Sequence, residues 1–187
     1  MNSVFYNKVI NSNHCRSVRV ELSDAVLKDK SLFAYLLTIA LTTENKNHHK
    51  ACWILELVCE KKIEWLGNYF DNFCKTLPVL TNESAIRPMS KICLFAATYA
   101  HRNQNFLTKN QLQHITEVCF DWLINPDRKV AAKAHAMRTL YILGKSNEWI
   151  YPELQPVLEQ DYANHTAAYK AAAKDILRKI IKEQQKN

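Results

Sequence analysis

Three lysines stand at the start of apolar stretches and are spaced almost evenly along the chain. Lys50, Lys91 and Lys133 lie 41 and 42 residues apart, and Arg87 and Arg138 lie near two of them. Equivalent positions of stacked repeats form a row, so these cations could bind phosphates along one edge of the protein. They could also bind carboxylates or helix ends of neighbouring repeats. We favour this structural interpretation. The candidate binding residues of this set are Arg87, Lys91, Lys133 and Arg138.

Four tryptophans supply flat surfaces on which a base or a peptide side chain could stack. The apolar spacing around Trp53 and Trp65 predicts that both pack in the core. Trp149 and Tyr151 lie beside a proline-rich turn, which indicates exposed rings there. We therefore expect a binding groove near the third helix pair, with these two aromatic residues and Trp122 as candidates.

Other residue patterns give little support for catalysis, a metal or a cofactor. The chain has two glycines, which leaves no phosphate-binding loop. No Gly-x-Ser-x-Gly elbow is present, and no Cys–His pair has supporting context. The seven histidines are scattered apart from His48 and His49, whose side chains diverge by about 100° on a helix. We expect no metal and no cofactor, and lean against an enzyme.

The composition is that of one compact protein, since 48% of the 187 residues are hydrophobic and 23% are charged. A net charge of +7 is moderately basic and admits a polyanionic partner such as a nucleic acid. The six cysteines form no C-x-x-C pair, and residues 1–13 lack an unbroken apolar run. These features favour a cytoplasmic protein. No apolar run approaches the roughly 20 residues that cross a bilayer.

Apolar residues recur every three to four positions, which is typical of amphipathic helices. The helices predicted in this way cover residues 48–60, 65–77, 84–100, 108–122, 127–143 and 166–183, with a further pair within 24–41. Thr108 and Gln111 form a capping box. We expect Gly144 to close a helix in the left-handed conformation. A short helix near Glu153 is expected to carry Pro156 in its first turn.

The longer helices repeat at about forty residues, which is the length of a helix pair. The predicted repeat units are 47–80, 82–125 and 127–183, after less regular helices in 1–46. A lone helix pair cannot bury its apolar face, whereas three or four stacked pairs share one core. We predict an all-α fold in a single domain, an α-α superhelix of three to four helix pairs like HEAT or armadillo repeats.

Four segments carry a closer resemblance that covers nearly the whole chain. They are residues 51–56 (ACWILE), 85–88 (AIRP), 119–124 (CFDWLI) and 129–134 (KVAAKA). Together they resemble a bacterial family of small helical-repeat proteins that often carry the label adenylosuccinate lyase. True lyases of that superfamily are much longer and have a glycine-started signature loop ending in Met-Pro-Lys-Asn. Here the nearest fragment, 87–91 (RPMSK), reverses proline and methionine, so the resemblance implies the fold and no lyase residue.

Our leading hypothesis is a non-catalytic scaffold for a protein or peptide partner, with no membrane partner. One alternative is nucleic-acid binding through a basic face. DNA-glycosylase variants of the HEAT fold combine such a face with aromatic rings and a carboxylate. Asp121 and the neighbouring Trp122 are the residues here that resemble this combination. A further alternative is an enzyme that matches the lyase label. The oligomeric state does not follow from the sequence.

Overall fold

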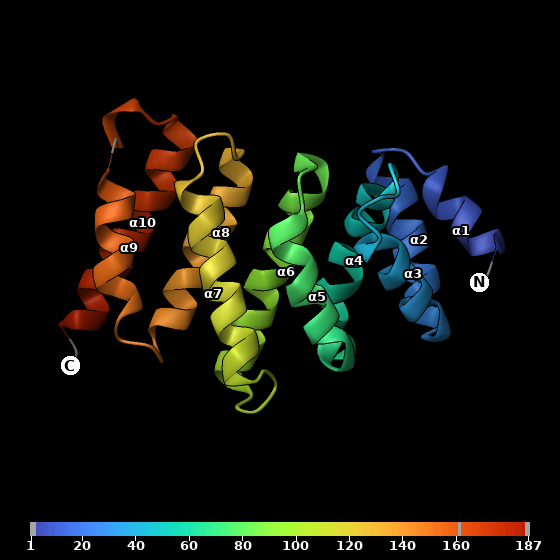
Figure 1. Cartoon of the computed structure of the whole chain (residues 1–187), viewed down its shortest axis with the longest axis horizontal. Helices are drawn as coiled ribbons and strands as arrows, with labels where there is room; N and C mark the ends of the chain where they lie inside the picture. The colour runs from blue at the N-terminus through green and yellow to red at the C-terminus, as the bar shows by residue number, and fades with distance from the viewer. Residues whose placement is uncertain (1–2, 161, 186–187) are drawn as a thin grey trace. The chain divides into compact units, whose positions relative to one another are not determined.

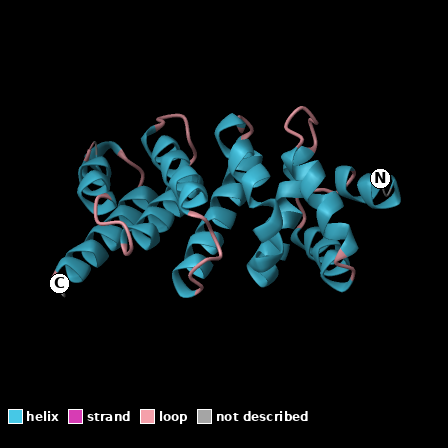
Figure 2. Cartoon of the chain, turned by 60° about the horizontal axis from the view of Figure 1, so that its bottom comes forward, coloured by secondary structure: helices cyan, strands magenta, loops and turns pink. Residues whose placement is uncertain are grey.

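The computed structural model describes residues 3–160 and 162–185, and these residues form helices and loops without a β-strand (Figure 2). The α-helices are α1 (Ser3–Ile10), α2 (Arg16–Lys28), α3 (Ser31–Leu41), α4 (His48–Lys62), α5 (Phe70–Thr76), α6 (Glu83–Arg102), α7 (Lys109–Ile124), α8 (Val130–Gly144), α9 (Ile150–Glu159) and α10 (Ala167–Gln184). Three 3-10 helices join them: η1 (Ile63–Tyr69), η2 (Leu77–Val79) and η3 (Tyr162–Asn164). The predicted all-α fold is confirmed.

The chain forms two compact units, Met1–Phe95 and Ala96–Asn187, and the boundary falls inside α6. In the first unit α4 packs against α2 and α3, and α1 contacts α3 and α4. In the second unit α8 packs against α7, α9 and α10 (Figure 1). Each unit therefore has a central helix, α4 or α8, whose neighbours cover its apolar surface.

The core of the first unit comes from the predicted apolar positions of its helices. Its largest fully buried side chains include Phe33, Leu36, Ile54 and Leu55. Burying one such side chain contributes roughly 2 kcal/mol relative to leaving it in water. Phe33 and Leu36 lie three positions apart on one face of α3, whereas Ile54 and Leu55 are adjacent on α4, which its neighbours cover on more than one side.

The segment predicted as one helix over residues 65–77 forms three short helices instead, η1, α5 and η2. Most of its apolar residues are nevertheless buried, with Leu66, Phe70 and Phe73 almost inaccessible, whereas Tyr69 is 36% exposed. Gly67 lies in η1 and is a weak helix former, and Pro78 cannot continue an α-helix. The predicted face was right, but the prediction of a continuous helix was wrong.

Local capping chemistry starts α7 as predicted. The Thr108 hydroxyl accepts the backbone N–H of Gln111, and the Gln111 side chain accepts the backbone N–H of Thr108. This reciprocal bonding satisfies donors that a helix N-terminus otherwise leaves unpaired. A five-residue connection then leads from α7 into α8, so the two helices form a hairpin (Figure 1).

Two predictions about the end of α8 and the start of α9 were wrong. Gly144 is the last residue of α8 but does not have a positive φ. Helix α9 begins at Ile150, so Pro152 occupies its first turn and Pro156 lies further inside. Glycine serves a packing role at position 144 because a Cβ there would overlap the ring of Tyr151.

Candidate functional site

Two of the three repeated lysines bind groups of their own unit. Lys50 Nζ donates to the carbonyl oxygen of Ile10, the last residue of α1, over 2.6 Å. A cation at a helix C-terminus satisfies an unpaired carbonyl and complements the helix dipole. Lys91 Nζ on α6 lies 3.0 Å from Glu56 Oε1 and 3.6 Å from Glu60 Oε1. Binding to a helix end and to carboxylates is what we predicted for these lysines if their role is structural.

A buried carboxylate, Glu56 on α4, organises the cations of the first unit. Its side chain is 7% exposed, and Arg87 Nη2 lies 3.2 Å from its second oxygen. A buried carboxylate is costly unless cations and donors surround it, so Arg87 and Lys91 both stabilise the α4–α6 contact. Glu56 was not among the residues predicted from the sequence, although its place inside the apolar run of 51–59 was an available signal.

Lys133 has a different environment, although the sequence placed it in register with Lys50 and Lys91. It is the fourth residue of α8, is 5% exposed and lines a cavity with His165 and Tyr169. Burial lowers the pKa of its ammonium group, and the charge of Asp127 opposes that shift. Arg138, further along α8, is exposed. The candidate cations therefore do not share one environment.

Two of the candidate aromatic residues are buried. Trp122 on α7 is 3% exposed, whereas the neighbouring Asp121 is exposed. Adjacent helical residues point in different directions, so the ring and the carboxylate do not form one site. Tyr151 is 8% exposed, stacks on Tyr141 and donates its hydroxyl to the Tyr141 carbonyl over 3.0 Å. Its expected exposure was wrong, because α9 begins at Ile150 and turns this ring onto α8.

Trp149 is 55% exposed and lies where the connection from α8 enters α9. The Phe120 ring stacks on it, with ring centroids 6.2 Å apart and planes 24° apart. This stacking covers one face of the indole and restricts its motion, while the remaining surface is open. The expected exposure of Trp149 is confirmed.

A groove of about 660 Å³ runs beside Trp149 in the second unit. Its lining combines apolar, amide, hydroxyl and charged side chains from α7, from the α8–α9 connection and from the first residue of α9, namely Lys109, Leu112, Gln113, Thr116, Glu117, Ser146, Asn147, Trp149 and Ile150. Gln113 donates to Glu117 over 2.8 Å, and Asn147 donates to the Leu143 carbonyl over 3.0 Å. The Asn147 side-chain oxygen and the Ser146 hydroxyl can still bind a ligand. The groove therefore combines apolar surface with charged and hydrogen-bonding side chains.

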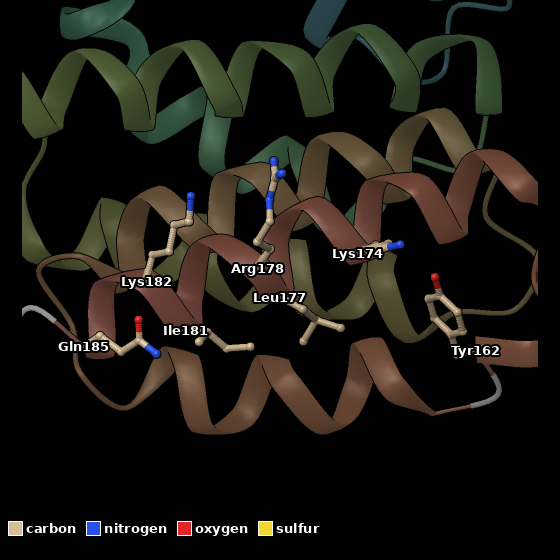
Figure 3. Close-up of a pocket in the computed structure, with 7 residues that line it drawn as sticks. All are labelled: Tyr162, Lys174, Leu177, Arg178, Ile181, Lys182 and Gln185. Carbon is tan, nitrogen blue, oxygen red and sulfur yellow. The ribbon is translucent and has the colours of Figure 1, made fainter.

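A second hollow, of about 430 Å³, lies along α10 (Figure 3). Lys174, Arg178 and Lys182 follow one another at every fourth position beside the apolar residues Leu177 and Ile181. Ile180 is buried and the adjacent Ile181 is 49% exposed, so α10 has apolar residues on two faces. That doubled apolar pattern was the sequence signal for this surface, which the sequence analysis did not select.

The buried thiols do not provide a nucleophile. Cys52 and Cys59 are fully buried, and burial raises the pKa of both thiols. Burial also raises the pKa of Cys74 to about 12. Nucleophilic attack requires the thiolate, which is scarce near neutral pH under these conditions. Among residues 3–160 and 162–185, no three metal-ligating side chains lie together, and no helix is long and apolar enough to cross a membrane.

A family model described as a HEAT repeat domain matches residues 6–180 of the chain. No curated protein and no solved structure matches it. The family match covers helices of both compact units and agrees with the all-helical fold and the α7–α8 hairpin described above.

Proposed function

The chain belongs to the HEAT repeat domain family, and we propose that it is a scaffold whose groove beside Trp149 binds a peptide segment of a partner protein. Stacked helix pairs of this kind typically present extended surfaces to other macromolecules. The observation that carries the proposal is the half-exposed Trp149 ring, held by Phe120 at the edge of a groove with polar groups.

The groove chemistry defines the peptide that fits it. Trp149, Leu112 and Ile150 offer an apolar contact for one aromatic or aliphatic side chain. The Asn147 and Ser146 side chains offer hydrogen bonds to the peptide backbone. Lys109 and Glu117 supply one charge of each sign, so the groove selects no strong net charge. We expect an apolar anchor residue in an otherwise polar segment.

A peptide library displayed on phage tests this proposal, because it samples many sequences at once and requires no identified partner. Enriched peptides should share an aromatic or aliphatic anchor and bind in solution, which fluorescence anisotropy of a labelled copy measures. Trp149→Ala should weaken that binding at least about tenfold, the equivalent of about 1.4 kcal/mol. Tyr35→Ala, which removes a 40% exposed ring in the first unit, is the matched control. Equal affinity for both variants, or no enriched peptide, would contradict the proposal.

Nucleic-acid binding is the second candidate function, and the basic residues of α10 are the observation that favours it (Figure 3). Lys50 and Lys91 already bind groups of their own unit, which weighs against a phosphate site built on them. Anisotropy titrations with labelled DNA and RNA at low and moderate salt test this function. Phosphate binding should weaken steeply with salt and with Lys174→Met plus Lys182→Met. Absence of binding at low salt would remove this candidate.

The lyase label gives no further candidate, because the signature loop is absent from the sequence and no relative carries that activity to this chain. No catalytic residue is part of the proposal. All of the residues that line the proposed groove belong to the second compact unit.

A further inference from the structure

A cavity of about 330 Å³ lies in the second unit, away from the Trp149 groove. Residues from the end of α7, the first turn of α8, the end of α9 and the segment leading into α10 enclose it. They are Leu123, Ile124, Pro126, Lys133, Val157, Gln160, Asn164, His165 and Tyr169. This volume is at the lower end of the range typical of small-molecule sites.

Among the described residues that line this cavity, Lys133 is the one lysine or arginine. Its side chain is 5% exposed, and within residues 3–160 and 162–185 no acceptor lies within hydrogen-bond or ion-pair distance of it. Asp127 influences it electrostatically without forming an ion pair. A buried ammonium group without a partner is unfavourable, and an anion placed beside it would relieve that cost.

The other lining residues indicate what kind of anion fits. Leu123, Ile124 and Val157 are apolar, and the His165 ring stacks on Tyr169 with centroids 3.7 Å apart. The side-chain amides of Gln160 and Asn164 are neutral hydrogen-bonding groups. One lysine balances one negative charge, and the part of the lining that the structure describes holds no arginine to clamp a phosphate dianion. The cavity therefore matches a singly charged group attached to an apolar body.

We propose that this cavity binds a monocarboxylate with a small apolar body. The carboxylate binds the Lys133 ammonium group and an amide of Gln160 or Asn164, while the body packs against Leu123 and Val157. A free organic acid and the C-terminal residue of a polypeptide share this chemistry. The site is independent of the Trp149 groove, so either can exist without the other.

Protein NMR with three defined probes tests the proposal. The probes are 4-methylpentanoate, N-acetyl-leucine and N-acetyl-leucinamide, which share an isobutyl group and differ in the carboxylate. Both acids should shift the side-chain amide signals of Gln160 and Asn164 in a saturable way. The affinity derived from these shifts should be at least about tenfold higher for each acid than for N-acetyl-leucinamide. Tighter binding of N-acetyl-leucine would indicate a polypeptide C-terminus, and equal binding would indicate a free acid.

Lys133→Met keeps the apolar stem of the side chain and removes its charge. It should abolish the shifts caused by the acids, whereas Lys75→Met, an exposed change of equal charge in the first unit, should leave them unchanged. Persistence of acid binding in Lys133→Met would overturn the proposal. The proposal would also be overturned if the acids and the amide bound with equal affinity, or if inorganic phosphate bound as tightly as the acids. A third contrary result would be the absence of any shift at tens of millimolar acid. The comparisons of acid with amide and phosphate use the native protein and hold even if Lys133→Met does not fold.

Discussion

At the scale of single residues, Glu56 decides which of the conspicuous cations are available to a partner. Its carboxylate lies between Arg87 and Lys91, and all three belong to the first unit. The charge at positions 87 and 91 therefore stabilises the contact of α4 with α6. Substituting either cation would disturb the fold before it could report on ligand binding.

Glu56→Gln should lower the free energy of unfolding by roughly 2 kcal/mol, because it removes the buried carboxylate that binds Arg87 and Lys91 and leaves Lys91 only the more exposed Glu60. Glu60→Gln removes a carboxylate of similar chemistry that is 47% exposed and lies 3.6 Å from Lys91. An exposed pair of this kind contributes less than about 1 kcal/mol. Urea unfolding of both variants measures the difference. Equal losses would show that Glu56 is not the organising charge.

The sequence could identify the repeated cations but not their partners. Lys50, Lys91 and Lys133 follow equivalent apolar patterns, yet they bind a helix end, two carboxylates and no described acceptor, respectively. The difference arises from residues distant in sequence, such as Glu56 and Ile10. Periodicity along one helix does not contain that information.

At the scale of the helices, the α8–α9 connection depends on the absence of a side chain at Gly144. The Tyr151 ring occupies the space where a Cβ would lie, and its position is fixed by the Tyr141 stacking and by a hydrogen bond to the Tyr141 carbonyl. Glycine usually weakens a helix relative to alanine. Here the close packing of α9 on α8 reverses that preference.

Gly144→Ala should therefore destabilise the protein by about 1–3 kcal/mol, the usual cost of overpacking. Thermal unfolding followed by circular dichroism measures the effect. In a Tyr151→Ala background the same substitution should be neutral or stabilising, because the overlapping ring is absent. A stabilising effect of Gly144→Ala in the native background would contradict the packing role.

Helix positions were largely predictable because each apolar face obeys the helical period. The Thr108–Gln111 capping box also predicted where α7 begins, because its hydrogen bonds join residues close in sequence and do not depend on how the helices pack. The break of the 63–79 segment into three pieces had a sequence signal in Gly67 and Pro78, which the apolar period outweighed in the prediction. The role of Gly144 was not predictable, because it depends on which ring lies opposite, and that is decided only when helices pack.

At the scale of the whole molecule, the distribution of thiols reports on how tightly the helices pack. Five of the six cysteines are buried in one unit or the other, and Cys15 is exposed before α2. Hydrogen bonding with Ser17, over 3.1 Å, lowers the pKa of Cys15. The exposed thiol is therefore also the one that ionises more readily.

One thiol per native chain should react rapidly with Ellman's reagent near pH 8, and all six should react in denaturant. Cys15→Ser should remove the rapid phase and leave the slow reaction unchanged. The slow thiols react as their units open, so their rates measure local stability in Met1–Phe95 and Ala96–Asn187 separately. Rapid reaction of a second thiol would show that a buried cysteine is accessible.

The open indole of Trp149 has a practical consequence. Trp122 is buried, Trp53 and Trp65 are partly covered, and Trp149 is the most exposed of the four. An exposed indole emits at longer wavelength and meets soluble quenchers more often than a covered one. The groove thus contains an intrinsic optical reporter, and a bound peptide would shield it. Partners can be screened by the intrinsic emission of the unlabelled protein.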